Sequence, residues 1–162
     1  MTIGLIPGSF DPFHNGHLEV VERASHIFDE VVVAAIRNPQ KSEALFDLDE
    51  RRDMIAESCS HISNVRIVSI STLLVNVARD VQATAIVKGL RAVSDFENEL
   101  QMAQMNRSLS GVETLFIPSS SDHSFIASRL LREVARFGGD VTQFVPPPVA
   151  KRLVALYPGG GL

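Results

Sequence analysis

The sequence lacks the features that mark secreted, membrane-spanning and nucleic-acid-coating proteins. Its single cysteine, Cys59, excludes a disulfide within the chain. No apolar run approaches the ~18 residues of a membrane-spanning helix, and the first residues do not resemble a signal peptide. With a net charge of −4 and a pI of about 5.7, the chain has no broad positive surface for a polyanion. We therefore expect a cytoplasmic protein with no nucleic-acid or membrane partner, in which any anion site is local.

The 162 residues, 45% of them hydrophobic, suffice for one domain with a sizeable core. Short β-prone runs alternate with segments of helical periodicity. Strands are predicted at 3–6, 31–36, 65–70, 85–87 and 114–117, and helices at about 18–28, 47–59, 72–78, 94–109, 126–137 and 149–156. This alternation is typical of a Rossmann-like three-layer α/β domain, with a five-stranded parallel sheet and helices on both faces. We expect one domain over residues 1–157 and a disordered tail over 158–162.

Several helix ends can be predicted from their residue types. Asp47 with Glu50, and Ser94 with Glu97, match the capping box, and Thr72 can cap the short third helix. Gly138 and Gly139 are expected to end the 126–137 helix. In the 94–109 helix, Phe96 and Leu100 are expected to belong to a core stripe.

Residues 7–17 read Pro-Gly-Ser-Phe-Asp-Pro-Phe-His-Asn-Gly-His and separate the first predicted strand from the first predicted helix. A strand–loop–helix junction offers a phosphate free backbone N–H groups and the positive end of a helix dipole. His14 and His17, in the pattern H-x-G-H, are candidate donors to phosphate oxygens. A metal site is the weaker alternative, because structural zinc normally takes four ligands and Cys59 lies in a separate helical segment.

Cations and hydroxyl side chains follow the other predicted strands. The candidate segments are 37–41 after the second strand, 88–91 after the fourth and 118–124 after the fifth. Carboxyl ends of parallel strands meet at one edge of the sheet, so we expect these loops to converge on one crevice for a polyphosphate. Lys88 directly follows an apolar strand and is expected to be partly desolvated, with an anionic partner.

Longer motifs narrow this interpretation. They are P-G-S-F-D-P at 7–12, F-D-L-D-E-R at 46–51, K-G-L-R at 88–91, D-F-E-N-E-L-Q-M-A-Q-M-N-R at 95–107, S-F-I at 124–126 and E-V-A-R-F-G-G-D-V at 133–141. In these runs the chain resembles the bacterial phosphopantetheine adenylyltransferases of the nucleotidyltransferase superfamily over nearly its full length. H-x-G-H is common to many adenylyl and cytidylyl transferases, whereas the G-L-R and D-F-E motifs are much more specific to this one family.

The resemblance implies transfer of AMP from ATP to 4′-phosphopantetheine, which gives dephospho-coenzyme A and pyrophosphate in coenzyme A biosynthesis. It implies direct in-line attack without a covalent enzyme intermediate, and Mg²⁺ bound mainly through the ATP phosphates. It further implies a homohexamer, and coenzyme A as a feedback inhibitor.

The resemblance also assigns roles by matching position. Catalytic roles fall to His17, which would stabilise charge on the α-phosphate, and to Lys41 and Arg91. ATP contacts fall to Ser9, Phe10, His17, Gly89, Leu90, Arg91, Glu99, His123, Ser124, Phe125, Ile126, Ala127, Ser128 and Arg129. Substrate contacts fall to Ser9, Lys41, Leu74 and Lys88, and no residue is assigned to a metal.

Four positions depart from the family pattern. His14 stands where many members have threonine, and His123 where an aromatic residue is usual. Ala127 and Arg129 replace two hydroxyl residues at the start of the last long helix. Arg129 either contacts an outer phosphate of ATP or points to solvent, and the sequence leaves both alternatives open.

Two other functions are alternatives. One is a different small-molecule nucleotidyltransferase, for example one that acts on nicotinamide mononucleotide or glycerol 3-phosphate. The R-T-x-G-I-S-T-T stretch typical of the cytidylyl enzymes is absent from the sequence. The other is an ATP-binding sensor without catalysis, for which the altered 127–129 segment is the one hint.

Overall fold

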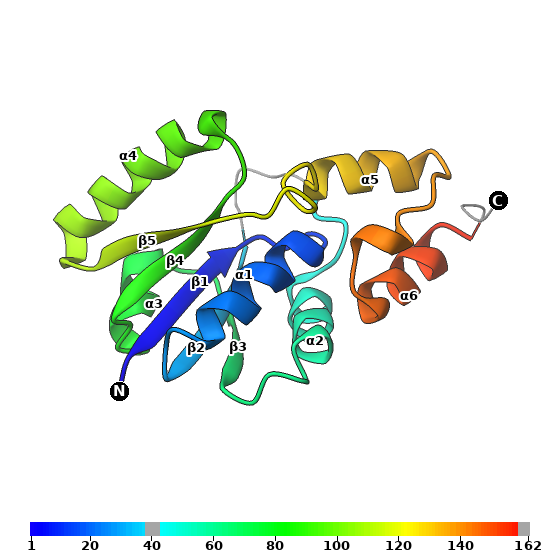
Figure 1. Ribbon diagram of the computed structural model, residues 1–162. Helices are drawn as coiled ribbons and strands as arrows, with labels where there is room; N and C mark the ends of the chain where they lie inside the picture. Colours follow the sequence, from blue (N-terminus) through cyan, green and yellow to red (C-terminus); the bar gives the residue numbers. More distant parts are fainter. Residues whose placement is uncertain (38–42, 159–162) are drawn as a thin grey trace.

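The computed structural model describes residues 1–37 and 43–158, and in this part the strands form one parallel sheet in the order β3-β2-β1-β4-β5 (Figure 1). The strands are β1 (Ile3–Gly8), β2 (Glu30–Ile36), β3 (Val65–Ile70), β4 (Ala85–Leu90) and β5 (Glu113–Pro118). The helices are α1 (Asn15–Ser25), α2 (Leu48–Ser58), α3 (Leu74–Asp80), α4 (Val93–Ser110), α5 (Ser128–Arg136) and α6 (Pro147–Leu156), with a 3-10 turn at Thr142–Phe144. The predicted three-layer α/β fold is confirmed.

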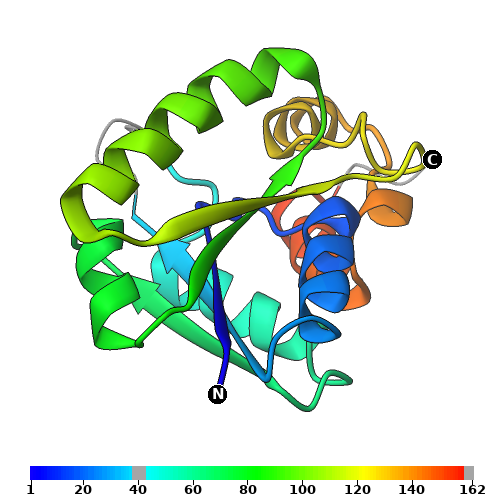
Figure 2. The ribbon, with the colours of Figure 1, turned by 60° about the vertical axis from the view of Figure 1, so that its left-hand side comes forward.

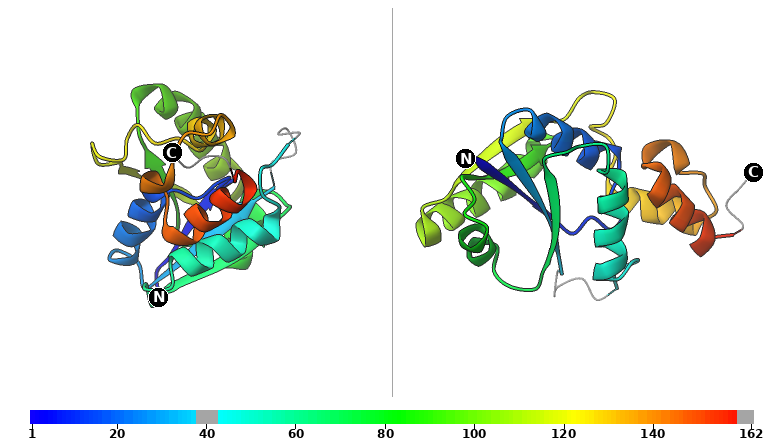
Figure 3. Two further views of the ribbon diagram at one scale, coloured as in Figure 1. Left: turned by 90° about the vertical axis from the view of Figure 1, so that its right-hand side faces the viewer. Right: turned by 90° about the horizontal axis from the view of Figure 1, so that it is seen from below.

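Both faces of the sheet are covered, as the continuous apolar run in β2 predicts. Val31, Val33 and Ala35 join a core cluster that includes residues of α1, α2, α5 and α6. Val32 and Ala34 point the opposite way, into a second cluster with α3. Figure 2 shows α3 and α4 on one side of the sheet and α1 on the other, and Figure 3 shows α6 beside α2.

Helix α1 lies close against β4, at a position where the strand has no side chain. A Cβ at Gly89 would lie 2.9 Å from Cγ2 of Val20, which is closer than such atoms approach. Glycine at this position therefore lets α1 pack over β1 and β4. The N-terminus of α1 is thereby held beside the carboxyl ends of these strands.

The predicted capping box of α2 is confirmed: Glu50 N donates to Asp47 Oδ1 (2.8 Å) and Asp47 N donates to Glu50 Oε2 (2.9 Å). The predicted box at Ser94 and Glu97 is wrong. Helix α4 already begins at Val93, so Ser94 lies within its first turn, and the N-cap residue Ala92 makes no side-chain bond. Two further helices begin at residues other than the predicted ones, and several strands also end at residues other than the predicted ones. Helix α1 begins at Asn15 and α5 at Ser128. The predicted Thr72 cap is also wrong, since α3 has Leu73 at its N-cap.

The expectation that Phe96 and Leu100 belong to the core is wrong. Their exposed fractions are 36% and 38%, and the buried residue of α4 is Asn106. Other large apolar side chains of α4 are also exposed, namely Val93, Met102, Met105 and Leu109. The apolar residues thus lie on several sides of the helix, and one stripe against the sheet cannot bury them all.

Among the described residues no helix is long and apolar enough to cross a membrane. The predicted tail, 158–162, lies outside the described residues except for Pro158.

Candidate active site

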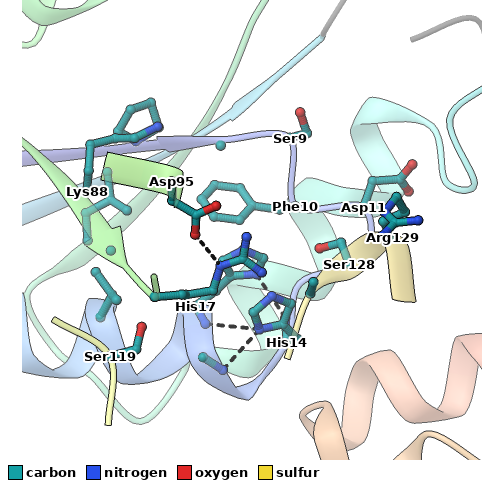
Figure 4. A pocket seen from close by; sticks show the side chains of 18 of the residues that line it. Ser9, Phe10, Asp11, His14, His17, Lys88, Asp95, Ser119, Ser128 and Arg129 are labelled. Atoms are coloured by element: carbon teal, nitrogen blue, oxygen red, sulfur yellow. Dashed lines mark hydrogen bonds and ion pairs between the residues drawn. The ribbon is translucent and has the colours of Figure 1, made fainter. Parts of the chain in front are cut away.

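A cleft of about 480 Å³ opens at the carboxyl ends of β1 and β4 (Figure 4). Strand β1 pairs with β2 on one side and with β4 on the other, so the strand order reverses direction here. Such a switch point is where open parallel sheets bind ligands. The loop after β1, the N-terminal ends of α1 and α5, the end of β4 and the first turns of α4 line the cleft.

The loop between β1 and α1 is fixed by buried polar side chains. Both Asp11 carboxylate oxygens accept backbone hydrogen bonds, from Leu45 N (2.8 Å) and Phe46 N (3.0 Å). Arg51, only 4% exposed, donates to the carbonyls of Ser9 (2.6 Å), Ile36 (3.1 Å) and Asp47 (3.3 Å). The F-D-L-D-E-R motif therefore supports this loop, although Arg51 does not line the cleft.

His14 caps helix α1. Its Nδ1 accepts from Gly16 N (3.1 Å) and His17 N (3.3 Å), while His14 N donates to Nδ1 of His17 (3.2 Å). This reciprocal arrangement is a capping box built from two histidines. Threonine is a usual N-cap residue and could fill the same role at this position. The sequence interpretation favours a phosphate donor over a helix cap at His14, and the structure shows that this residue caps α1.

The same bonds determine the tautomer of both histidines. Because each Nδ1 accepts a backbone N–H, the proton of each neutral ring lies on Nε2. Their ring centroids are 3.6 Å apart, with an angle of 21° between the planes, so the two rings are stacked in the cleft (Figure 4).

Both rings are neutral at pH 7. Burial, followed by the charges of Arg91 and His123, lowers the pKa of His14 to about 3. Burial, then His14 and the charges of Arg91 and Lys88, lower the pKa of His17 well below its usual 6.5. A neutral imidazole with its proton on Nε2 can donate one hydrogen bond to a phosphate oxygen.

Two cations at the end of β4 are paired with carboxylates of α4. Lys88 Nζ lies 3.3 Å from Glu99 Oε2, and Arg91 Nε lies 3.2 Å from Asp95 Oδ2. Arg91 Nη1 also donates to the carbonyl of Ile126 (3.1 Å). Asp95 and Glu99 are four residues apart on one face of α4, and all four charged side chains line the cleft. The partly buried Lys88 has the anionic partner that the sequence predicts.

The N-terminus of α5 forms the opposite wall. Its N-cap, Ala127, makes no side-chain bond, which leaves the first-turn N–H groups without a side-chain cap. Ser128 Oγ donates to the carbonyl of Pro12 (2.9 Å), and Arg132 Nη1 donates to that of Asp11 (2.5 Å). The side chain of Arg129 is 77% exposed and lies 3.9 Å from Glu133. A helix N-terminus flanked by two arginines suits an anion.

The structure brings most predicted site residues together. Those that line the cleft are Ser9, Phe10, His17, Lys88, Gly89, Arg91, Glu99, Ala127, Ser128 and Arg129. Those that do not line it are Leu74, Leu90, His123, Ser124, Phe125 and Ile126. Lys41 lies outside the described residues.

The excluded residues have other contacts. Leu74 packs against the second core cluster. Ile126 belongs to the first core cluster, and its backbone carbonyl accepts a hydrogen bond from Arg91. Phe125 is exposed and meets Phe144 edge to face, with ring centroids 5.8 Å apart. Sequence reasoning missed Asp95 and Arg132 in the lining, whereas Ser119 belongs to the predicted 118–124 segment. Arg132 lies one turn after Ser128, a spacing that places both on one helix face and could have indicated it.

The part of the chain that the structure describes contains no group of three or more His, Cys, Asp and Glu residues suited to a metal ion. The carboxylates of Asp95 and Glu99 are occupied by Arg91 and Lys88. The carboxylates of the cleft therefore suit a metal ion bound mainly by the phosphate oxygens of a ligand better than a metal ion bound by protein side chains.

Comparisons with known proteins agree with this geometry. The sequence profile of the cytidylyltransferase-like family matches residues 5–134. The phosphopantetheine adenylyltransferase of Heliobacterium modesticaldum is 52% identical over 97% of this chain and 94% of its own length. The one from Streptomyces coelicolor is 52% identical over 94% of this chain and 96% of its own length.

Solved structures share the fold at low identity. A putative nicotinate-nucleotide adenylyltransferase from Vibrio parahaemolyticus superposes with a TM-score of 0.67 and 19% identity, over 95% of this chain and 99% of its own. A bifunctional NMN adenylyltransferase/ADP ribose pyrophosphatase from Francisella tularensis gives 0.72 and 14%, over 96% of this chain and 49% of its own. On the strength of the family profile and the full-length relatives, the chain belongs to the cytidylyltransferase-like family and, within it, to the phosphopantetheine adenylyltransferases.

Proposed function

We propose that the protein transfers AMP from ATP to 4′-phosphopantetheine and releases pyrophosphate and dephospho-coenzyme A. The names of the full-length relatives support the reaction and both substrates. The observation that carries the proposal is the pair of neutral imidazoles at the N-terminus of α1, opposite Lys88 and Arg91 in one cleft. Neutral donors and cations together suit a reaction in which negative charge passes between phosphates.

The chemistry we propose is direct in-line displacement. An oxygen of the pantetheine phosphate attacks the α-phosphorus, and the bond to the oxygen that bridges the α- and β-phosphates breaks, with its electron pair leaving on pyrophosphate. Nε2–H of His17 donates to the α-phosphate as charge builds on its oxygens. Arg91 and the N-terminus of α5 hold the outer phosphates, and Lys88 holds the attacking phosphate.

The surroundings of Cys59 support a mechanism without a covalent intermediate. This thiol is buried at the C-terminal end of α2 and does not line the cleft. Burial, and then the nearby charge of Glu22, raise its pKa to about 12. A neutral, enclosed thiol is a poor nucleophile, so direct attack between the two substrates fits this site.

Three features of the family extend the proposal. Mg²⁺ would arrive with ATP and bind mainly through its phosphate oxygens, where it would offset their charge. Assembly into a homohexamer, with coenzyme A as a feedback inhibitor, is likewise proposed; the exposed apolar side chains of α4 support burial of this helix against another copy. Sedimentation velocity measures the assembly state, and a monomer at micromolar concentration would contradict it.

Pyrophosphate release tests the reaction. The purified protein should release pyrophosphate from ATP and Mg²⁺ with 4′-phosphopantetheine, and should not do so with nicotinamide mononucleotide or glycerol 3-phosphate. Activity with another ester would assign the protein to a different nucleotidyltransferase. ATP binding without release from any ester would favour a sensor.

Two variants test how the cleft is divided between the substrates. Lys88→Ala should weaken phosphopantetheine binding, and Arg91→Ala should weaken ATP binding, each by about tenfold or more, because each removes a charge-assisted contact. Calorimetry with each ligand alone measures both affinities. If Lys88→Ala lost ATP affinity and kept phosphopantetheine affinity, the assignment of Lys88 would be wrong.

A further inference from the structure

Helix α1 holds the loop that joins β5 to α5 at three points. The Glu19 carboxylate accepts from Ser120 N (3.1 Å) and Ser120 Oγ (2.9 Å), and it lies 2.7 Å from Nδ1 of His123. Arg23, one turn further along α1, pairs with Glu19 (3.2 Å) and donates to the carbonyl of Pro118 (2.5 Å). The loop is thus fastened at positions 118, 120 and 123 to a helix that is distant in sequence.

Glu19 is the centre of these contacts and is well shielded from solvent. Its side chain is 15% exposed, and each of its two oxygens has more than one partner. Burial alone would raise the pKa of Glu19, but the hydrogen bonds from His123 and Ser120 outweigh it and lower the pKa. The carboxylate is therefore charged at neutral pH, and its hydrogen bonds to the loop are of the stronger, charge-assisted kind.

The fastened loop forms part of the cleft. Ser119 lines the cleft at one end of the loop, and Ala127 and Ser128 line it at the other. Glu19 itself does not line the cleft. It lies two residues after His17 on α1, so the same helix positions the His17 donor and this wall of the cleft.

We propose that Glu19 is a positioning residue for the nucleotide: it holds the β5–α5 loop so that Ser119 and the N-terminus of α5 meet ATP. The proposal rests on the proposed function, since that function places ATP at this wall and phosphopantetheine near Lys88. Loss of Glu19 releases Ser120 and His123 together, and the loop can then move away from α1. The resulting defect concerns ATP, and not the attacking phosphate.

Calorimetry with ATP and with phosphopantetheine, each alone, provides a test that does not depend on turnover. Glu19→Ala should raise the Kd for ATP about tenfold, because several charge-assisted bonds to the loop are lost. The Kd for phosphopantetheine should stay within about twofold of the wild-type value. Glu19→Gln keeps the size of the side chain and can still accept from Ser120, so it should fall between wild type and alanine.

Two further variants serve as controls. Glu22→Ala removes an exposed carboxylate of the same helix, which pairs with His61 and lies outside the cleft, and should leave both affinities unchanged. His123→Ala should weaken ATP binding less than Glu19→Ala does. The double variant Glu19→Ala/His123→Ala should be no worse than Glu19→Ala alone, because both changes release the same contact.

The outcomes separate the proposal from a general structural role. Equal losses for both ligands, together with a lower thermal midpoint, would overturn it, as would an unchanged Kd for ATP in Glu19→Ala. If wild-type protein binds ATP but transfers AMP to no phosphopantetheine, the proposed function fails. The comparison of ATP affinities between Glu19→Ala and Glu22→Ala then still decides the role of Glu19.

Discussion

Replacing His17 by alanine removes a donor that the fold prepares in advance. The His14 N–H holds Nδ1 of His17 and so places its proton on Nε2. The ring is further confined between Phe13, at 5.5 Å, and His14, at 3.6 Å between ring centroids. Because position and tautomer are both set before ATP binds, little reorganisation remains when charge develops on the α-phosphate.

The size of the effect follows from this preorganisation. Loss of one such donor typically lowers turnover by about two to three orders of magnitude, or about 2.7–4 kcal/mol in activation free energy. ATP affinity should change much less, since a neutral donor contributes mainly where charge is greatest. Stability should fall by only about 1 kcal/mol, because the His14 N–H loses its acceptor at the end of α1.

Steady-state pyrophosphate release at saturating substrates measures kcat, and urea unfolding measures stability. His26→Ala is the matched control, since this exposed histidine follows the same helix and does not line the cleft. It should leave kcat unchanged. A kcat for His17→Ala within about threefold of wild type, far from the loss expected for a transition-state donor, would remove His17 from the mechanism.

Three further predictions concern His14, Arg51 and Arg129. Because both cleft histidines have a folded pKa below 6.5, the unfolded chain binds more protons in acid. The free energy of unfolding should therefore fall between pH 7 and pH 5, by about 2 kcal/mol from His14 and further in the same direction from His17. The fall should be smaller in His14→Asn, and equal falls in urea titrations of the two proteins would contradict this. Arg51→Met removes the side-chain donor from three carbonyls, although that of Asp47 keeps the backbone N–H of residue 51. The free energy of unfolding in urea should fall by about 3 kcal/mol, and unchanged stability would show that other donors replace the guanidinium. Arg129→Ser should weaken ATP binding at low salt, and less so at high salt. An ATP affinity equal to that of the wild type at both salt concentrations would place Arg129 outside the phosphate site.

The order of the strands along the chain and the location of the site could be predicted because each depends on local pattern. The apolar run at 31–36 can be buried only in a sheet covered on both faces, and the structure places it at β2. Parallel strands deliver their carboxyl ends to one edge, so Lys88, Arg91 and the H-x-G-H residues meet there.

The remaining features depend on partners that are distant in sequence. The apolar side chains of Phe96 and Leu100 suit a core as well as an interface between copies of the chain. Only the packing of α4 shows that they are exposed. Likewise, a histidine ahead of a helix indicates a phosphate ligand as readily as a cap, until the bonds of His14 are known. Glu19 resembles any charged residue on a helix surface, because its partner Ser120 lies 101 positions away.

The ion pairs of Lys88 with Glu99 and of Arg91 with Asp95 affect how a ligand enters and leaves the cleft. An anion at a distance meets two cations whose charge is already balanced, so long-range attraction should contribute little to association. Binding then becomes an exchange, in which phosphate oxygens take the positions of carboxylate oxygens at contact range. After transfer, Asp95 can return to Arg91 as pyrophosphate departs, and Glu99 can return to Lys88 as the other product departs, which gives the cleft its own means of releasing highly charged products.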